Sequence, residues 1–518
     1  MLKLYLQHRL NYLFRCTACG DRADYSDLAT RYDSTILSVL RRICHNHPLS
    51  QRAISIAQLP AQLGGLGIKS WFDTADPAFL ASYLYSATIL PTYFPHLTNA
   101  FSQPSKRVNP IHISPKQCSN PIFIVNSTSI TPSSNDAKLV CNRLDAYNNQ
   151  QASARVCNGK SLFHIQANLS RHCDSTRQSS IISSLRSNKS EPRSIQLLAR
   201  FLSGIGDTIS FNTTPSDRLT TLSNQQLKIA ILQRILEPII PTTYIKNNCR
   251  YNATFTCPKC NKSSVPITSV DQIGGPDDID PYGFHAFRCT ADGHAPRTKL
   301  LHDKLRDTWL RVLKSAGFDA KRESYNEMES CNKRPDISVL LDDELCSLFL
   351  DVRTCDPLLK SCFKQCCQTQ GHAANLGAIS KDRDWANISS AQGDQFQPIC
   401  HEHPGFIGEG ALALLDRAAA RYATTMPQRN AFKTFWLQRI HLTNTRGTAN
   451  LIISRMPFSE IYSSFDNEAY HCPFPTTLPM SSPCHHSTSF PLPMPPPTYK
   501  PNNLTAGNSL LSYAAAVY

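Results

Sequence analysis

Two pairs of metal-binding residue types constrain this sequence more than any other feature. The first pair lies in the tight motif Cys257-Pro258-Lys259-Cys260, and the second consists of His285 and Cys289. Two thiolates from one turn and a further His/Cys pair can complete the tetrahedral shell of a structural zinc ion. We therefore predict a zinc site made by Cys257, Cys260, His285 and Cys289. His294 and His302 are alternative ligands, and ordinary cysteines in a cysteine-rich chain are the competing interpretation.

Charge and cysteine content favour an intracellular protein with a polyanionic partner. The chain has 518 residues, a formal net charge of +14 and a sequence pI near 9.0, which favours binding to nucleic acid or to an acidic membrane surface. No apolar run approaches the roughly 18 residues of a membrane span. The N-terminus lacks the continuous apolar core of a signal peptide, so we expect the 20 cysteines in a reducing compartment and the protein not to be secreted.

Apolar periodicity and composition divide the chain into five regions. Residues 1–90 are predicted to be helical, and residues 91–245, rich in Ser, Asn, Thr and Pro, to be a loosely ordered linker with local helices such as 195–203 and 222–238. The strongest patterns lie in the zinc region 250–295 and in the block 296–425. Residues 426–518 are predicted to be a helix followed by a disordered proline-rich tail from about Pro473.

A helix is predicted at 300–316 and is expected to end at the C-cap residue Gly317. One apolar face is formed by Leu301, Leu305, Trp309, Val312 and Leu313. Its basic residues, which include Lys304 and Arg306, either form a solvated face or contact phosphates, and the sequence does not decide between the two. We also consider Lys259 and Arg288 as candidates for contact with a DNA backbone.

Two β-rich segments flank the acidic stretch Asp342-Asp343-Glu344 and predict a hairpin. With a two-residue turn at Asp343-Glu344, residues whose numbers sum to 687 face each other, and Asp336 and Asp351 satisfy this sum. Directly paired positions have Cβ atoms roughly 4.5–5.5 Å apart. Carboxylates this close repel each other unless a cation lies between them. The alternative is an ordinary pair of solubilising aspartates at the ends of a hairpin.

This pair of carboxylates predicts hydrolysis of phosphodiesters. Mg²⁺ binds proteins through one or two carboxylates and keeps several waters, and it can polarise a phosphate and lower the pKa of an attacking water. Arg353, two residues beyond Asp351, points to the same face of its strand. A cation there can neutralise charge that develops on the phosphate in the transition state.

These motifs resemble a known family. Arg334-Pro335-Asp336 with Asp351-Val352-Arg353 resembles the PD-(D/E)xK restriction-like endonucleases. The order of parts resembles the C-terminal end of site-specific non-LTR retrotransposon proteins, in which a Cys-Cys-His-Cys zinc knuckle precedes such an endonuclease. The segments 280–289 and 301–307 resemble the second half of that knuckle and the helix after it. Residues 396–399, Gly408 and the segment 409–422 resemble the closing strand and helix.

The resemblance implies an α+β or α/β protein with a helical N-terminal region, a zinc knuckle and a restriction-endonuclease-like mixed sheet flanked by helices. Asp336 and Asp351 would hold Mg²⁺, and Glu323 would be an auxiliary carboxylate. Lys381-Asp382-Arg383-Asp384-Trp385 is similar to the family's Lys-x-x-Lys-Tyr stretch, with Asp384 in place of the second lysine. Lys381 and Arg353 would stabilise the transition state or orient water.

Upstream, Leu59-Pro60, the glycine-rich stretch 64–67 and residues 78–82 resemble the region just after the polymerase of these elements, and no Phe/Tyr-x-Asp-Asp polymerase strand occurs. The chain is therefore expected to be the C-terminal part of a retroelement protein, either a fragment or a truncated copy. It would nick target DNA to prime reverse transcription, in the nucleus if the organism is a eukaryote, with the element's RNA as a possible further partner and without a membrane. One alternative is a catalytically decayed, zinc-dependent nucleic-acid-binding remnant. Another is a scaffold whose proline-rich tail binds partner domains.

Overall fold

The fold is defined over three long parts of the chain and several short segments. The computed structural model describes residues 22–44, 47–74, 78, 112–115, 123–126, 165–188, 191, 193–205, 216–217, 219–240, 243–246, 249–252, 256–264, 272–273, 275, 278–289, 291, 298–322, 334–341, 347–392, 395–403 and 405–456. All of them belong to the first of two units, Met1–Phe465, and the second unit is Asp466–Tyr518. The helix expected at the very start of the chain, Glu323, His294 and the proline-rich tail therefore lie outside the described residues.

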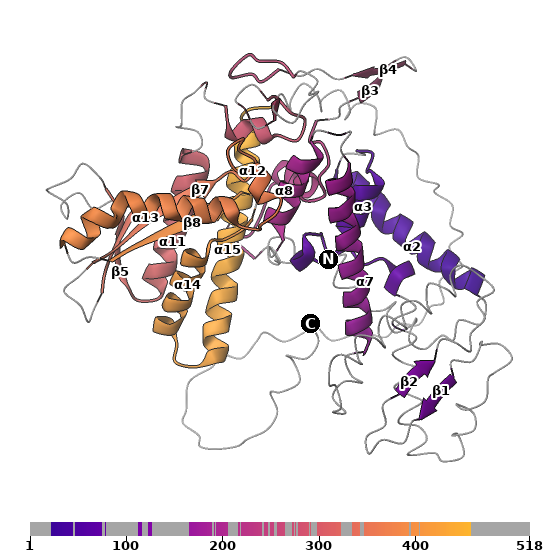
Figure 1. The fold of residues 1–518 in the computed structure, drawn as a ribbon, viewed down its shortest axis with the longest axis horizontal. Helices are drawn as coiled ribbons and strands as arrows, with labels where there is room; N and C mark the ends of the chain where they lie inside the picture. Colours follow the sequence, from indigo (N-terminus) through magenta and orange to yellow (C-terminus); the bar gives the residue numbers. More distant parts are fainter. Residues whose placement is uncertain are drawn as a thin grey trace, which may run out of the picture. The chain divides into compact units, whose positions relative to one another are not determined.

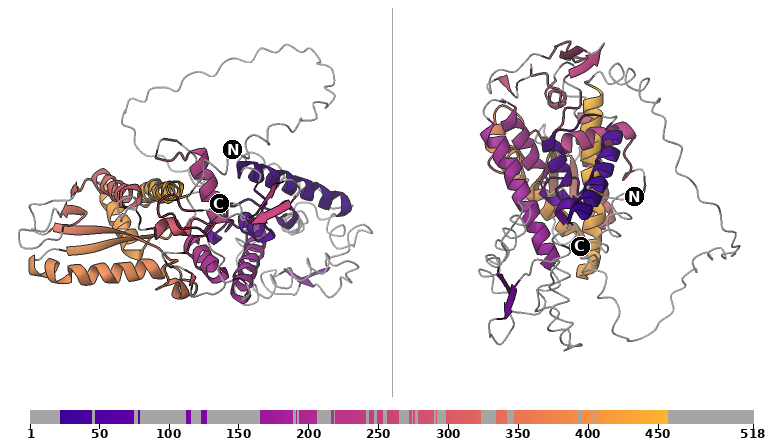
Figure 2. Two further views of the ribbon diagram at one scale, coloured as in Figure 1. Left: turned by 90° about the horizontal axis from the view of Figure 1, so that it is seen from above. Right: turned by 90° about the vertical axis from the view of Figure 1, so that its right-hand side faces the viewer.

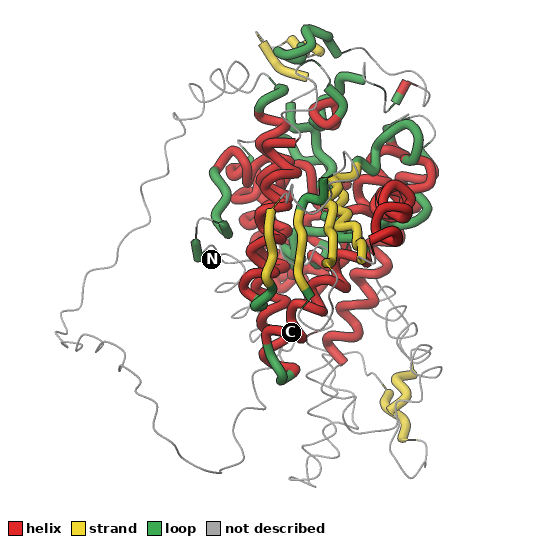
Figure 3. Tube along the Cα trace, turned by 90° about the vertical axis from the view of Figure 1, so that its left-hand side faces the viewer, coloured by secondary structure: helices red, strands yellow, loops and turns green. Residues whose placement is uncertain are grey.

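A mixed four-stranded sheet organises the most strongly patterned part of the sequence. Its strands are β5 (Asp319–Arg322), β6 (Ile337–Leu340), β7 (Ser347–Cys355) and β8 (Gln395–Glu402), in that spatial order. The β5–β6 and β6–β7 pairs are antiparallel and β7–β8 is parallel, and Figure 3 shows the strands side by side. With helices around this sheet, the expected α+β class is confirmed.

The parallel pair requires a crossover connection, because a tight turn cannot join parallel neighbours. The crossover contains α12 (Phe363–Cys366) and α13 (His372–Gln392). α13 packs on β7 and β8, while α11 (Asp303–Ser315) packs against β5 and α14 (Glu409–Tyr422) against β8. Figure 2 shows α13 on one side of the sheet and α11 on the other. Most side chains of β7 are consequently buried on both faces of the sheet.

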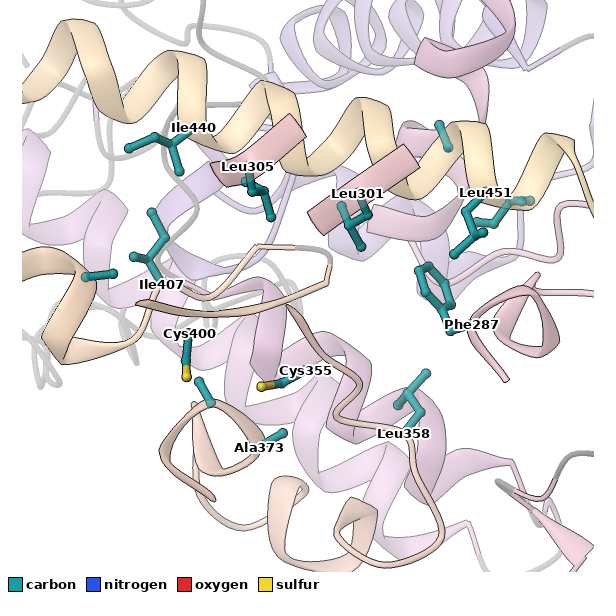
Figure 4. Packing of buried hydrophobic residues seen from close by; sticks show 14 of the residues in the cluster. Phe287, Leu301, Leu305, Cys355, Leu358, Ala373, Cys400, Ile407, Ile440 and Leu451 are labelled. Carbon is teal, nitrogen blue, oxygen red and sulfur yellow. The ribbon is translucent and has the colours of Figure 1, made fainter. Parts of the chain in front are cut away.

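The predicted helix at 300–316 corresponds to a short π-type turn, η7 (Thr298–His302), followed by α11. All five residues of its predicted apolar face have fully buried side chains. Gly317 adopts φ +83°, the left-handed conformation expected of a C-cap glycine. The long helix α15 (Met426–Ile453) crosses this helix closely at Gly447, where a Cβ would lie 2.7 Å from the Leu300 carbonyl oxygen. Figure 4 shows Leu301 and Leu305 beside α15.

The N-terminal part of the described chain is helical, as predicted. It contains α2 (Arg22–Ile43), α3 (Gln51–Gln58) and the short η1 (Ala61–Leu63), which leads into the glycine loop with Gly64 at φ +95° (Figure 1). Short antiparallel hairpins pair β1 (His112–Pro115) with β2 (Phe123–Asn126), and β3 (Thr243–Lys246) with β4 (Cys249–Asn252). No helix in the described ranges is long and apolar enough to cross a bilayer.

The structure describes three helices within the region that we expected to be loosely ordered. α8 (Ser194–Gly204) confirms the local helix expected at 195–203. The prediction for 222–238 was too long, because α9 (Asn224–Arg234) ends before Leu236, which has φ +57°. α7 (Ile165–Ser187) was not anticipated, since its Ser-rich sequence has little periodicity. Its buried Ile181 and Leu185 lie one turn apart and join the main core.

One continuous apolar core connects the N-terminal helices with the sheet. It includes Ile56 of α3, Phe201 of α8 and Ile399 of β8. A buried hydrogen bond also links α8 to β8, since the Ser203 hydroxyl donates to Glu402 Oε2 at 2.6 Å. The sheet therefore packs against helices that precede it in the chain and against helices that follow it.

Candidate metal sites

The four predicted zinc ligands come together at one place. Their ligand atoms all lie within 4.8 Å of one another. Cys257 Sγ lies 3.9 Å from Cys289 Sγ, and Cys260 Sγ lies 3.4 Å from His285 Nε2. Zinc–sulfur bonds of about 2.3 Å in a tetrahedron place two sulfurs about 3.8 Å apart. The cluster could therefore hold a metal ion and is compatible with zinc.

Local backbone geometry places both halves of the cluster. After the Cys-x-x-Cys motif, Asn261 adopts φ +56°, and its amide donates to the Cys257 carbonyl. In the second half, the buried Asp280 carboxylate accepts hydrogen bonds from the backbone amides of Tyr282, Phe284 and His285. This carboxylate caps the short helix η6 (Phe284–Phe287). The turn thus presents His285 and Cys289 together.

The imidazole of the cluster is in the neutral form that binds metal ions. Burial, followed by the nearby Arg288, lowers the pKa of His285 to about 4, so its imidazole is neutral at pH 7. Burial and the neighbouring Cys257 raise the pKa of the Cys289 thiol to about 11. Thiols in this environment lose their protons readily only when a dication compensates the negative charge.

Arg288, between two of the cluster residues, is buried and does not face solvent. Its Nη1 lies 3.3 Å from Asp278 Oδ2, its Nε lies 3.3 Å from Asp356 Oδ2, and its Nη2 donates to the Leu358 carbonyl. Arg306 is also buried and pairs with acidic residues of its own helix. Our suggestion that Arg288 and Arg306 contact DNA is therefore wrong, whereas Lys259 and Lys304 are exposed.

The predicted hairpin register is confirmed. β6 and β7 pair Ile337 with Leu350 and Leu340 with Ser347, both of which sum to 687. The same register places Asp336 opposite Asp351, and the two carboxyl groups are close enough for Asp336 to raise the pKa of Asp351. The turn residues 342–346 lie outside the described residues. A local sequence pattern was therefore sufficient to predict that the two aspartates lie opposite each other.

Both carboxylate oxygens of Asp336 are held by hydrogen bonds. His302 Nε2 lies 3.1 Å from Oδ1, and the Val352 amide donates to Oδ2 at 2.7 Å. Burial would raise the pKa of Asp336, but these two partners together hold it below its usual value. The same contact raises the pKa of His302 against the lowering effect of burial. His302 is thus a partner of the aspartate pair and not a ligand of the cysteine cluster.

Asp351 is bound by two residues of the crossover helix. Lys381 Nζ donates to its Oδ2 at 2.6 Å, and Trp385 Nε1 donates to the same atom at 3.1 Å. Burial and the adjacent Asp336 raise the pKa of Asp351, and Lys381 offsets only part of that effect. The two aspartates therefore titrate as a coupled pair in which Asp351 takes the proton first.

The sequence of α13 explains how Lys381 reaches the sheet. Gly377, Lys381 and Trp385 repeat every four residues and share one face of the helix. A Cβ at Gly377 would lie 2.6 Å from the Cys355 sulfur, so glycine permits this close approach. Trp385 stacks on Phe396, with ring centroids 5.1 Å apart. Asp384, which departs from the family's second lysine, is exposed.

Arg353 lies on the face of β7 that α13 covers. Its Cδ is within 3.4 Å of a Cβ built on Gly377, and its side chain is half-buried. The expectation that it shares a face with Asp351 is confirmed. Glu323, the fifth predicted catalytic residue, lies outside the described residues.

Sequence reasoning missed two residues of this site, His302 and Trp385. Trp385 was detectable, because it follows Lys381 by one helical turn. His302 carried no comparable signal, because its contact with Asp336 joins positions 34 apart in the chain.

Within the described residues, the cysteine–histidine cluster is the one group of three or more metal-binding side chains. The aspartate site offers two carboxylates. No protein-family model matches the sequence, and a comparison with curated proteins finds no match.

Proposed function

We propose that this chain is a Mg²⁺-dependent DNA endonuclease of the PD-(D/E)xK type, from the C-terminal part of a non-LTR retrotransposon protein, and that it nicks target DNA to prime reverse transcription. The observation that carries the proposal is the convergence of three predicted catalytic residues. Asp336 and Asp351 face each other across the β6–β7 pair, and Lys381 of the crossover helix donates to Asp351.

The donor set fits Mg²⁺. Both groups are hard carboxylate oxygens, and Mg²⁺ commonly binds through only one or two carboxylates and completes its shell with water and substrate phosphate. When bound, the ion would supply Lewis-acid polarisation of the phosphate and a more acidic attacking water.

The protein's own residues would orient and neutralise charge. Lys381 holds Asp351 at 2.6 Å and brings a positive charge to the carboxylate pair. Arg353 adds a second cationic side chain on the same face of the sheet. Positive groups that are fixed before the reaction stabilise charge that develops on a phosphate at little reorganisation cost. Glu323 keeps its proposed role as an auxiliary carboxylate.

The cysteine–histidine cluster is proposed to hold structural Zn²⁺. Three thiolates and one imidazole fill a tetrahedral shell, whereas catalytic zinc sites keep one position open for water or substrate. The ion would fix the turn that carries Arg288, whose guanidinium joins this turn to Asp356 just after β7. DNA as partner, the element's RNA and, in a eukaryote, a nuclear location belong to the same proposal. The net charge of +14 supports a nucleic-acid partner.

Nicking of supercoiled plasmid by the full chain tests the proposal. We expect Mg²⁺-dependent conversion to open circles that EDTA prevents and that Asp336→Asn or Asp351→Asn abolishes. Asp319→Asn is the matched control, because Asp319 is an exposed aspartate of the same sheet and its loss should leave nicking intact. Nicking that survives in the double variant Asp336→Ala/Asp351→Ala would exclude this pair as the catalytic site.

The second candidate is a decayed, zinc-dependent nucleic-acid-binding remnant. Asp384 at the position of the family's second lysine favours it. DNA binding that needs no Mg²⁺, weakens steeply with salt and is not followed by nicking would support this candidate over the nuclease.

A further inference from the structure

His302 is the one residue from outside the sheet and its crossover helix that contacts the aspartate pair through a hydrogen bond in the described part of the chain. Its Nε2 lies 3.1 Å from Asp336 Oδ1. The other oxygen, Oδ2, accepts from the Val352 amide on the neighbouring strand. His302 therefore controls the one Asp336 oxygen that the sheet backbone does not hold.

The position of His302 is fixed by the packing around it. It ends the turn η7, between Leu301 and the helix α11. Leu301 and Leu305 are both fully buried, and Leu301 packs against α15 at Gly447 (Figure 4). A histidine on such an anchored backbone presents its ring at a defined place and loses little further entropy on forming the bond.

The hydrogen bond from His302 acts against the electrostatic repulsion between the two aspartates. Asp336 faces Asp351 across the β6–β7 pair, and two carboxylates in such positions repel each other when both are ionised. Rotation of the Asp336 carboxyl group away from Asp351 would relieve the repulsion. The His302 hydrogen bond opposes that rotation and keeps the two groups converging before any cation arrives.

We infer that His302 is a positioning residue that holds Asp336 in its ion-binding orientation through Oδ1. The inference rests on the proposed nuclease function and adds a residue to the same site. A role in core packing alone is disfavoured by exposure, because the His302 and Asp336 side chains keep 21% and 16% of their surface in solvent. Partners of metal-binding side chains typically change metal affinity or activity by about 10–100-fold when they are replaced.

Two variants separate positioning from packing. His302→Leu keeps the approximate volume and removes the donor, whereas His302→Gln keeps a donor near the place of Nε2. We expect His302→Leu to raise the Mg²⁺ concentration for half-maximal nicking by about 10-fold or more, with the rate at saturating Mg²⁺ much less affected. His302→Gln should restore most of the Mg²⁺ affinity. His372→Leu is the control, because His372 is a half-buried histidine at the start of α13 that has no described contact with either aspartate.

Direct ion binding separates failure of this inference from failure of the proposed function. Mn²⁺ binding to the full chain, followed by calorimetry without DNA, should weaken in His302→Leu and recover in His302→Gln. If the unmodified chain nicks DNA and His302→Leu needs no more Mg²⁺, His302 is not a positioning residue. If the unmodified chain neither nicks DNA nor binds Mn²⁺ at Asp336, the nuclease proposal fails, and the role of His302 fails with it. Equal Mn²⁺ affinity of all three proteins would refute the inference even if none of them nicks DNA.

Discussion

Arg288 makes ion pairs with two buried aspartates at once, so its replacement should have a large and specific effect on stability. The Arg288, Asp278 and Asp356 side chains are 3%, 0% and 1% exposed, respectively. Arg288→Met keeps the length of the side chain and removes the charge. Asp278 would keep Arg193, which lies 2.6 Å away. Asp356 would keep the Leu358 amide and a 3.8 Å contact with His403.

The expected magnitude follows from that difference between the two aspartates. Removing one partner of a buried ion pair typically costs about 3–5 kcal/mol, because the other charge stays buried without compensation. Asp278 retains a direct ion pair with a second arginine, and Asp356 retains weaker favourable contacts. We therefore expect Arg288→Met to lower the free energy of unfolding by about 3 kcal/mol, at the lower end of this range. Neutralising Asp356 as well should recover part of this loss. The double variant Arg288→Met/Asp356→Asn should therefore be about 1–2 kcal/mol more stable than the sum of the single effects predicts.

Urea denaturation at pH 7 with saturating Zn²⁺, followed by tryptophan fluorescence and circular dichroism, measures these differences. Arg311→Met is the matched control, because Arg311 is an exposed arginine on α11, and its loss should change stability by less than about 0.5 kcal/mol. An Arg288→Met protein as stable as this control, or strictly additive single effects, would refute the assignment of Arg288 as a buried electrostatic link.

Three further predictions concern metal, catalysis and pH. The full chain should retain one Zn²⁺ per molecule after dialysis by metal analysis, and Cys289→Ser should lose it. Lys381→Met should abolish nicking without loss of folding, and Lys381→Arg should restore part of it, because an arginine can still pair with Asp351. Acid should destabilise the fold through His401, whose pKa burial lowers to about 3 from 6.5. Between these values the unfolded chain binds the extra proton, so stability falls as pH decreases, by about 2 kcal/mol from pH 7 to pH 5. Denaturation at both pH values should show that the pH dependence of stability is smaller by about this amount in His401→Gln.

Control variants accompany the zinc and nicking experiments, and each of the three predictions has an outcome that would contradict it. Cys367→Ser removes a thiol outside the cluster and should keep the zinc. Lys364→Met removes an exposed lysine near the crossover helix and should keep nicking. Zinc retained by Cys289→Ser, nicking retained by Lys381→Met, or an unchanged pH dependence in His401→Gln would contradict the respective assignment.

Local patterns in the sequence were sufficient to predict the arrangement of the aspartate pair and of the cysteine–histidine cluster. The hairpin register follows from strand alternation and a short acidic turn, and so it placed Asp336 opposite Asp351 correctly. The Cys-x-x-Cys and His-x-x-x-Cys spacings each fix a pair of ligands on one turn, and the structure brings the two pairs together. The apolar face of α11 followed from its helical periodicity.

Contacts between distant segments could not be read from local patterns. Arg288 and Arg306 look like surface arginines in the sequence, but acidic partners in the fold allow their burial. α9 ends just before Leu236, which has a left-handed backbone conformation. The residue type does not predict this, because leucine rarely adopts a positive φ. α7 has a sequence that favours helix weakly, and packing of its buried face stabilises it instead. The nuclease activity, Mg²⁺ and the role of Glu323 stay predictions.

The spacing on α13 has a genetic consequence. Lys381 and Trp385 reach Asp351 together because they follow Gly377 by one and two helical turns. Loss of a single codon between Gly377 and Lys381 would preserve the reading frame but rotate everything after it by about 100° around the helix axis. Both donors would leave the aspartate in one event, whereas a substitution at an outward position such as Asp384 would leave them in place. Among copies of such a gene, the codons for this stretch should therefore tolerate substitutions far better than in-frame insertions or deletions.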